Sequence, residues 1–168
     1  MTSYRDHIAR SKRKVAIAVV VVSDSRTGDS DESGPAARRL LEEGGHVVSE
    51  QILVGNDGHA IEKAVKGLLA NPQVDAIITI GGTGMGKKDI TVETLSGMME
   101  KELNGFGELF RMMSYEQIGT GAIMSRSTAG IAGGKVVICL PGSKSAVELA
   151  IKRIIVPEIG HMVTEATR

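Results

Sequence analysis

Residues 15–22 read VAIAVVVV and residues 23–28 read SDSRTG, and this junction of an apolar run with a polar run decides the fold. Consecutive apolar residues that are mostly β-branched are typical of a parallel strand covered by helices on both faces. The polar run predicts a loop at the carboxyl end of that strand. A helix start signal at residues 31–35 completes a strand–loop–helix unit.

The same alternation continues along the chain. Further strands are predicted at residues 47–54, 74–80 and 136–140. Four helices are predicted between them. The first ends at Gly44 and Gly45, and the second is capped by Asn56 and Asp57. The third is capped by Thr91 and runs through Met99, and the fourth spans residues 106–118. The alternation predicts a three-layer α/β/α fold with a mostly parallel, doubly wound sheet.

Two segments need separate treatment. Residues 123–134 mix Ser, Thr and Gly with isolated apolar residues, and they fit neither a helix nor a strand pattern. The last helix begins near residues 143–145 and is expected to kink or break at Pro157, because proline has no backbone N–H to donate.

Composition indicates one soluble domain over residues 15–168, preceded by a basic arm over residues 1–14. The arm fits a targeting or RNA-binding segment, but it lacks an apolar core and stacking aromatics, which favours a solvated leader. Twenty basic residues balance 20 acidic ones, so net charge gives no argument for a nucleic acid or membrane partner. We expect a cytoplasmic protein, because no apolar run reaches membrane-spanning length.

The single cysteine, Cys139, excludes an intramolecular disulfide and a multi-cysteine zinc site. It lies within the predicted strand at residues 136–140, which favours a buried apolar role over a reactive thiol.

Three polar loops follow predicted strands, at residues 23–28, 81–89 and 141–145. Ligands of doubly wound sheets bind at the carboxyl ends of the strands, so these loops should converge on one crevice. The last of them opens a helix and offers an anion site there, although Ser143 and Ser145 each fit a plain helix cap equally well.

Residues 81–89, GGTGMGKKD, form what we call the glycine loop. Its glycines allow backbone N–H groups to approach an anion, Lys87 and Lys88 suit a polyphosphate, and Asp89 suits a magnesium ion. A tight turn without a ligand is the alternative. The loop nearly matches a P-loop, but Lys88 stands where the magnesium-binding hydroxyl is required, and the spacing excludes the dinucleotide fingerprint.

Several motifs in order resemble the MoaB/Mog family of molybdenum cofactor biosynthesis proteins, and the stand-alone MoaB type in particular. They are VSDS at 22–25, TIGGTG at 79–84, KDIT at 88–91, GFGE at 105–108, MSR at 124–126 and LPGS at 140–143. The resemblance covers about residues 15–159. Lys88 replaces an arginine that is common in the family and Val92 replaces a common proline; the first change keeps the charge but loses the bidentate fork.

The resemblance implies a molybdopterin-binding fold and adenylylation of molybdopterin by ATP with Mg²⁺. It assigns catalysis and metal binding to Asp57 and Asp89, although either carboxylate also fits a helix cap. It assigns ligand binding to Ser23, Asp24, Gly81, Gly82, Thr83, Gly84, Lys88, Glu108, Ser125, Arg126, Pro141, Gly142 and Ser143. Glu108 also fits a surface pair with Arg111 one helical turn away.

Two other functions compete with the adenylyltransferase. A non-catalytic molybdopterin carrier or scaffold would bind the pterin without chemistry, and a P-loop-like NTPase would bind nucleotide without pterin. The resemblance also implies a homo-oligomer, a trimer or a hexamer, with the downstream metal-insertion protein as a candidate partner. We hypothesise that the basic arm packs on a neighbouring subunit. Four methionines fit either an apolar interface or the core: Met98, Met99, Met112 and Met113.

Overall fold

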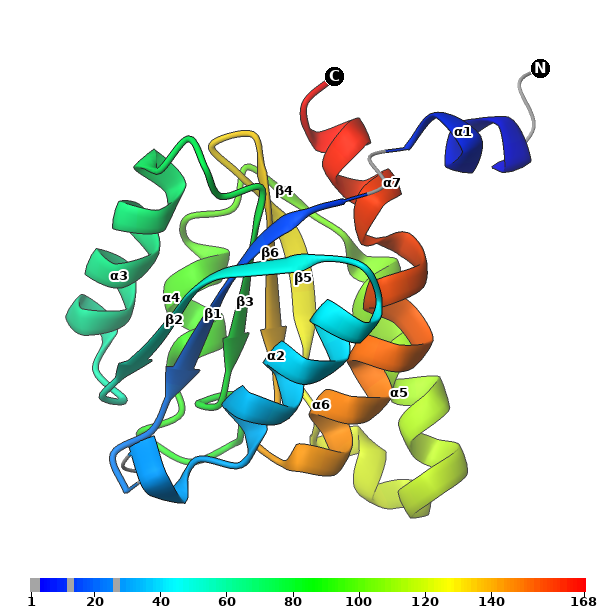
Figure 1. The fold of residues 1–168 in the computed structure, drawn as a ribbon. Coiled ribbons are helices and arrows are strands. Elements are labelled where there is room, and N and C mark those ends of the chain that lie inside the picture. The colour runs from blue at the N-terminus through cyan, green and yellow to red at the C-terminus, as the bar shows by residue number, and fades with distance from the viewer. Residues whose placement is uncertain (1–3, 12–13, 26–27) are drawn as a thin grey trace.

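One mixed sheet has the strand order β2-β1-β3-β6-β5-β4 (Figure 1). The computed structural model describes residues 4–11, 14–25 and 28–168. The strands are β1 (Ala16–Val22), β2 (Val47–Val54), β3 (Ala76–Ile80), β4 (Lys101–Glu102), β5 (Thr128–Ala132) and β6 (Lys135–Leu140). The four strands β2, β1, β3 and β6 are parallel, whereas β5 runs antiparallel to β6 and β4 antiparallel to β5.

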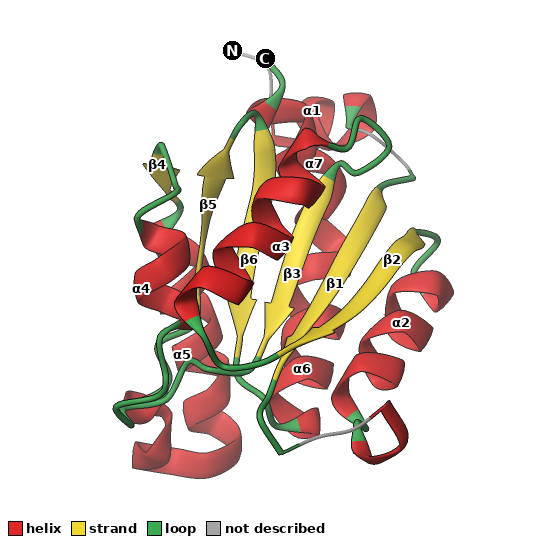
Figure 2. Cartoon of the chain, turned by 90° about the vertical axis from the view of Figure 1, so that its left-hand side faces the viewer, coloured by secondary structure: helices red, strands yellow, loops and turns green. Residues whose placement is uncertain are grey.

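Helices cover both faces of this sheet (Figure 2). They are α1 (Tyr4–Arg10), α2 (Ser33–Glu43), α3 (Gly58–Ala70), α4 (Thr91–Ser96), α5 (Asn104–Ile118), α6 (Lys144–Ala150) and α7 (Val156–Ala166), with short 3-10 segments η1 (Gly28–Ser30) and η2 (Gly119–Met124) and a π-helical turn η3 (Ile151–Ile155). The helices α3 and α4 lie on one face, and α2, α5, α6 and α7 lie on the other. The predicted three-layer α/β/α fold is confirmed.

Strand β1 explains why the apolar run at residues 15–22 determines this architecture. Its alternate residues Ile17, Val19 and Val21 belong to the core cluster beneath α2 and α6, while Ala18 and Val20 belong to the cluster beneath α3. Both sets are at most 1% exposed. A strand that packs against helices on both faces cannot alternate apolar with polar residues, so it reads as continuous aliphatic sequence.

The C-terminal helical segment shows what Pro157 does. The chain continues through α6, the π-helical turn at Ile151–Ile155 and α7, and Pro157 occupies the first turn of α7. A π-helical turn is the usual way for a helix to absorb a disrupted hydrogen-bond ladder. The expected disturbance is therefore local, and the helical path continues to Ala166.

Three local predictions differ from the structure. The ambiguous residues 123–134 contain the end of η2, strand β5 and a turn at Gly133 and Gly134, both with positive φ. Strand β4 was not predicted, because two residues carry no periodicity. Thr91 does not cap α4, which ends at Ser96; the capping position is Ile90, which makes no side-chain cap bond, and Thr91 is buried in the first turn.

The remaining surface and core features agree with ordinary packing. Cys139 is fully buried, as predicted, and burial raises the pKa of its thiol to about 12, which keeps it protonated and unreactive.

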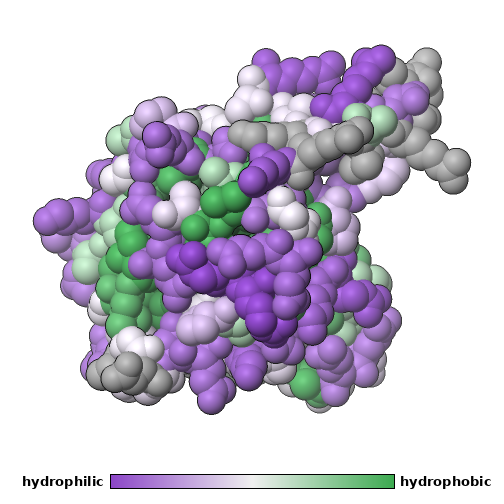
Figure 3. All heavy atoms as spheres, viewed as in Figure 1, coloured by the Kyte–Doolittle hydropathy of each residue, from purple (hydrophilic) through white to green (hydrophobic). Residues whose placement is uncertain are grey.

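The outer face of α2 is polar, with the pairs Arg38–Glu42 and Arg39–Glu43, and hydrophilic residues dominate this side of the molecule (Figure 3). Within the described ranges, no helix has the length and apolarity needed to cross a membrane.

We expect His46 to make the stability depend on pH. Its Nδ1 accepts a hydrogen bond from the Val15 backbone N–H at 3.3 Å, and burial lowers its pKa, which the backbone at Val156 only partly opposes. Because folding favours the neutral imidazole, its contribution is present above the unfolded pKa of about 6.5 and is lost as the pH falls below it. Urea unfolding at pH 7.5 and 5.5 should show a smaller decrease for His46→Asn than for the wild type. A decrease of equal size in both proteins would refute this role, and His59→Asn, at an exposed site, is the control.

Candidate functional site

The loops that follow β1, β2, β3 and β6 enclose a cavity of about 590 Å³ at the carboxyl ends of the parallel strands. It is lined by Val22, Ser23, Asp24, Ser25, Asn56, Gly81, Gly82, Thr83, Gly84, Asp89, Phe110, Ser114, Ile118, Met124, Ser125, Pro141, Gly142, Ser143 and Ala146. The predicted convergence of the three polar loops on one crevice is therefore confirmed. We refer to this space as the site cavity.

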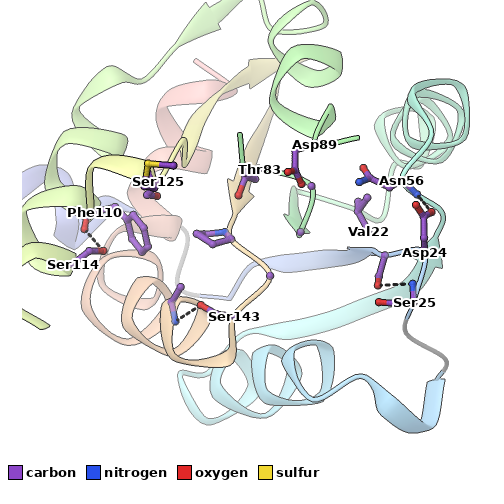
Figure 4. Close-up of a pocket in the computed structure, with 18 of the residues that line it drawn as sticks. Val22, Asp24, Ser25, Asn56, Thr83, Asp89, Phe110, Ser114, Ser125 and Ser143 are labelled. Carbon is purple, nitrogen blue, oxygen red and sulfur yellow. Dashed lines mark hydrogen bonds between the residues drawn. The ribbon is translucent and has the colours of Figure 1, made fainter. Parts of the chain in front are cut away.

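The site cavity has two chemically different sides (Figure 4). Asp24 and Asn56 lie on one side, and Phe110, Ser114 and Ser125 lie on the other, with the glycine loop between them. The second side also carries the apolar side chains of Ile118 and Met124 from α5 and η2. A ligand that fills the cavity would thus meet carboxylate and amide groups at one end and an apolar, partly aromatic surface at the other.

The start of the glycine loop requires glycine for steric reasons. Gly81 has φ +107°, and a Cβ there would lie 2.3 Å from the carbonyl oxygen of Val22. Gly82 has φ +66°, and a Cβ there would lie 2.2 Å from Oγ1 of Thr91. Both positions combine a left-handed backbone with a close approach to neighbouring atoms, so the loop lies directly on the end of β1 and on α4.

Asp89 closes the glycine loop and faces the site cavity. Its Oδ2 accepts a hydrogen bond from the Gly86 N–H at 2.9 Å, and its own N–H donates to the Gly86 carbonyl at 3.0 Å. A Cβ at Gly84 would lie 2.7 Å from the same carboxylate oxygen. The glycines therefore leave room for the carboxylate, and the loop's own turn fixes its orientation.

Asn56 and Asp57, in the loop between β2 and α3, have different environments. Asp57 is exposed and caps α3, where its Oδ1 accepts a hydrogen bond from the Ala60 N–H at 2.8 Å, and it is not among the residues that line the site cavity. Asn56 does line the cavity, and its backbone N–H donates to Oδ1 of Asp24 at 2.7 Å. The family resemblance implies a functional carboxylate at Asp57, with a helix cap as the alternative; the structure shows the cap and places Asn56 in the cavity lining.

The side of the cavity that Asp24 and Asn56 form contains oxygen atoms that could bind a cation. The carboxylates of Asp24 and Asp89 both line the cavity. Among the described residues, Oδ1 of Asn56, next to Gly82, is buried without a hydrogen-bond partner, as is Oγ1 of Thr91, which is not among the residues that line the cavity. No group of three or more His, Cys, Asp or Glu side chains with metal-binding geometry occurs in the described part of the chain. Magnesium in phosphate-binding sites usually has only one or two carboxylate ligands, so this donor set fits it.

The third loop lines the site cavity and also caps a helix. Ser143 lines the site cavity and caps α6, where its Oγ accepts a hydrogen bond from the Ala146 N–H at 3.4 Å. Ser33, at the start of α2, donates from its hydroxyl to the Gly142 carbonyl at 2.8 Å. The loop is thus held from α2 and presents Pro141, Gly142 and Ser143 to the cavity.

Three of the predicted ligand residues lie outside the cavity lining. Lys88 and Glu108 are exposed, and Arg126 bonds to backbone carbonyls of the glycine loop and to Glu93. Arg111 bonds to the Ser125 and Ser127 carbonyls, at 3.5 and 3.2 Å.

Sequence reasoning missed Phe110 and Ser114 as cavity residues. Their spacing of four on a helix was the only available signal, because residues four apart share one face.

Comparison with known families supports the sequence resemblance. A family model described as "Probable molybdopterin binding domain" matches residues 18–161. Molybdenum cofactor biosynthesis protein B of Bacillus cereus is 42% identical over 167 residues, which are 99% of each chain. The protein of the same name from Bacillus subtilis is 41% identical over 164 residues, which cover 97% of this chain and 96% of that one.

Solved structures agree in fold. A crystal structure of a molybdenum cofactor biosynthesis protein B superposes with a TM-score of 0.89 at 43% identity and covers 94% of this chain and 98% of that chain. The tungsten cofactor synthesizing protein MoaB from Pyrococcus furiosus superposes with a TM-score of 0.78 at 32% identity, covering 94% and 100%. The Mog protein from Mycobacterium ulcerans reaches 0.81 at 26% identity, covering 90% and 99%.

Proposed function

This chain belongs to the molybdopterin-binding family of molybdenum cofactor biosynthesis proteins, and from that premise we propose that it transfers AMP from Mg-ATP to molybdopterin. The observation that carries the proposal is the two-sided site cavity. Its apolar side, which carries the exposed side chains of Ile118 and Met124 over the buried Phe110, suits a flat pterin ring. Its opposite side combines the glycine loop with Asp24 and Asp89, which suits phosphates and their counter-ion.

The reaction needs positioning more than acid–base chemistry. The terminal phosphate of molybdopterin attacks the α-phosphorus of ATP in line, a new P–O bond forms, and the bond to pyrophosphate breaks. The glycine loop offers backbone N–H groups to the phosphates, and the hydroxyl of Ser143 offers another donor beside them. Lys87 and Lys88 are exposed at the loop's exit and lower the local negative charge.

Asp89 and Asp24 would hold the magnesium ion, with the Asn56 amide oxygen as a neutral ligand. A bound Mg²⁺ offsets the negative charge of the triphosphate and so favours approach of a second phosphate. This assignment competes with the prediction from the family resemblance that Asp57 provides the second carboxylate. The exposed position of Asp57 and its bond to the Ala60 N–H support a helix cap instead.

A direct comparison of variants separates these assignments. We expect Asp57→Ser to keep AMP transfer within about threefold of the wild type, because serine is also a good helix cap. Asp24→Asn should lower it at least about tenfold, because the metal loses a charged ligand. Mass spectrometry of the pterin product after incubation with molybdopterin and Mg-ATP measures both. A large loss in Asp57→Ser with unchanged thermal stability would return the catalytic role to Asp57.

A molybdopterin carrier is the second candidate, and one observation favours it. The residue that faces the cavity after β2 is the neutral Asn56, so this side of the cavity has one carboxylate fewer than the sequence pattern predicted. A carrier needs the apolar wall and the phosphate-binding loop but not the metal. Tight pterin binding without an adenylylated product, in an assay in which an active enzyme works, would support the carrier.

We also propose a homo-oligomer that forms through an exposed apolar surface, the α5–η2 patch. It consists of Met112, Tyr115, Ile118, Ile123 and Met124, each between 56% and 77% exposed. Clustered apolar side chains of this size usually mark an interface in soluble proteins. The other three methionines of the sequence pattern, Met98, Met99 and Met113, pack partly buried against the core.

The α5–η2 patch predicts a specific effect on assembly. Tyr115→Asp places a charge at its centre and should lower the mass measured by light scattering at least twofold, because a buried unpaired charge is costly. Gln117→Asp adds the same charge to an exposed site on the same helix and should leave the mass unchanged. An unchanged mass in Tyr115→Asp, or a monomeric wild type, would contradict the proposal.

A further inference from the structure

We propose that Arg126 is a positioning residue: with Glu93 as its counter-ion, it holds the glycine loop in the shape that presents Asp89 to the site cavity. The sequence pattern suggests instead a direct contact between Arg126 and the pterin or a phosphate. The hydrogen bonds of its guanidinium group distinguish these roles.

The guanidinium group bonds to both ends of the glycine loop. Its Nε donates to the Thr83 carbonyl at 3.1 Å, and its Nη2 donates to the Asp89 carbonyl at 3.2 Å. These two carbonyls are six residues apart in sequence, so one planar group fixes the distance between them. The planar fork of arginine suits this double contact, and a lysine ammonium has no comparable geometry.

Glu93 completes the arrangement from α4. Both of its carboxylate oxygens accept hydrogen bonds from Arg126, one from Nη1 and the other from Nη2 at 3.2 Å. The bond to Arg126 lowers the pKa of Glu93, so the pair stays ionised at neutral pH. Nε, Nη1 and Nη2 therefore all have protein partners, and the positive charge is balanced beside the loop, which disfavours phosphate binding by this side chain.

The segment that carries Arg126 is itself held in place. Arg111, on α5, donates from Nη1 to the Ser127 carbonyl at 3.2 Å and to the Ser125 carbonyl at 3.5 Å. Arg111 thus connects α5 to residues 125–127, and Arg126 connects this segment to the glycine loop. Backbone bonds also restrain the loop: the Thr91 N–H donates to the Gly82 carbonyl at 3.0 Å, and Gly86 bonds to Asp89. Arg126 adds the contacts to the Thr83 and Asp89 carbonyls, which these bonds do not reach.

The central test compares Arg126→Lys with Arg126→Ala by hydrogen–deuterium exchange of the hydrogen-bonded amides of Gly86, Asp89 and Thr91. Both variants should exchange at least about tenfold faster there than the wild type, because lysine keeps the charge but not the double contact. Amides of β1 and β3 should be unchanged, which excludes general destabilisation. Arg39→Lys and Arg39→Ala, at an exposed pair with Glu43, are the matched controls.

Kinetics give a second readout that rests on the proposed AMP transfer. Both Arg126 variants should lose kcat about 10- to 100-fold, with KM for ATP within about twofold, because a misplaced loop slows the reaction more than binding. Glu93→Gln keeps one acceptor and should show a smaller change in exchange and in kcat.

Three results would overturn the proposal: unchanged exchange at Gly86, Asp89 and Thr91, exchange that lysine restores to the wild-type rate, or a selective rise of KM in Arg126→Ala that lysine reverses. The last two would indicate a role for the charge, as in a ligand contact. If the wild type transfers no AMP, the proposed function fails, and the exchange experiment still decides the role of Arg126.

Discussion

The Asp89→Asn variant is expected to transfer AMP at least about 100-fold more slowly than the wild type, because a metal site that loses a carboxylate no longer neutralises the triphosphate. The change is nearly isosteric. The amide oxygen of asparagine can still accept the hydrogen bond that the Gly86 N–H donates to Asp89, so the glycine loop should keep its shape. The effect should therefore appear in kcat and in the magnesium dependence, while the thermal stability stays close to that of the wild type.

Two comparisons make this result specific. Glu43→Gln removes a carboxylate from an exposed pair on α2, remote from the site cavity, and should leave AMP transfer unchanged. Excess Mg²⁺ should partly restore Asp89→Asn if the lost carboxylate is a metal ligand. Full activity of Asp89→Asn at limiting Mg²⁺ would remove Asp89 from the mechanism.

The Phe110→Ala variant is expected to lower the free energy of unfolding by about 3 kcal/mol or more. Phe110 is 1% exposed, stacks against Phe106 with a centroid distance of 6.5 Å, and belongs to the core cluster under α5 as well as to the wall of the site cavity. Truncation removes buried aromatic surface and leaves a void that the packed sheet cannot close. The same change also alters the apolar wall of the site cavity that the proposal assigns to the pterin.

Urea unfolding measures this effect, with Gln117→Ala as the matched control on the same helix. Gln117 is exposed and lies outside the α5–η2 patch, so its truncation should change the stability by no more than about 0.5 kcal/mol. Pterin affinity should fall in Phe110→Ala at temperatures where the variant is still folded. Equal stability losses in the two variants would contradict the role of Phe110 as a buried core side chain.

Continuous aliphatic strands made the sheet predictable. The runs that became β1, β3 and β6 are almost wholly aliphatic and are followed by polar loops, whereas β2, at the edge of the sheet, mixes apolar with polar residues. Strands β4 and β5 could not be predicted in the same way. They are short and pair antiparallel at one edge, where Gly130 replaces a periodic apolar residue because a Cβ there would lie 2.4 Å from the Lys101 carbonyl.

The candidate site was predictable in position but not in the direction of each side chain. Three loops at the carboxyl ends of the strands had to meet, and they do. Whether Asn56 or Asp57 faces the cavity depends on where α3 begins, because a shift of one residue exchanges the capping side chain for the one in the cavity lining. The role of Arg126 depends on carbonyl groups that no sequence pattern displays.

Tracing both ends of ATP in one reaction tests the central claim most directly. Purified protein is incubated with molybdopterin and Mg-ATP labelled with ³²P at either the α or the γ position, and the products are separated. The account predicts that the α label appears in the pterin and the γ label in pyrophosphate, in equal amounts and only when pterin is present. Pterin that binds tightly but acquires no α label, or γ label that is released as free phosphate without pterin, would contradict it.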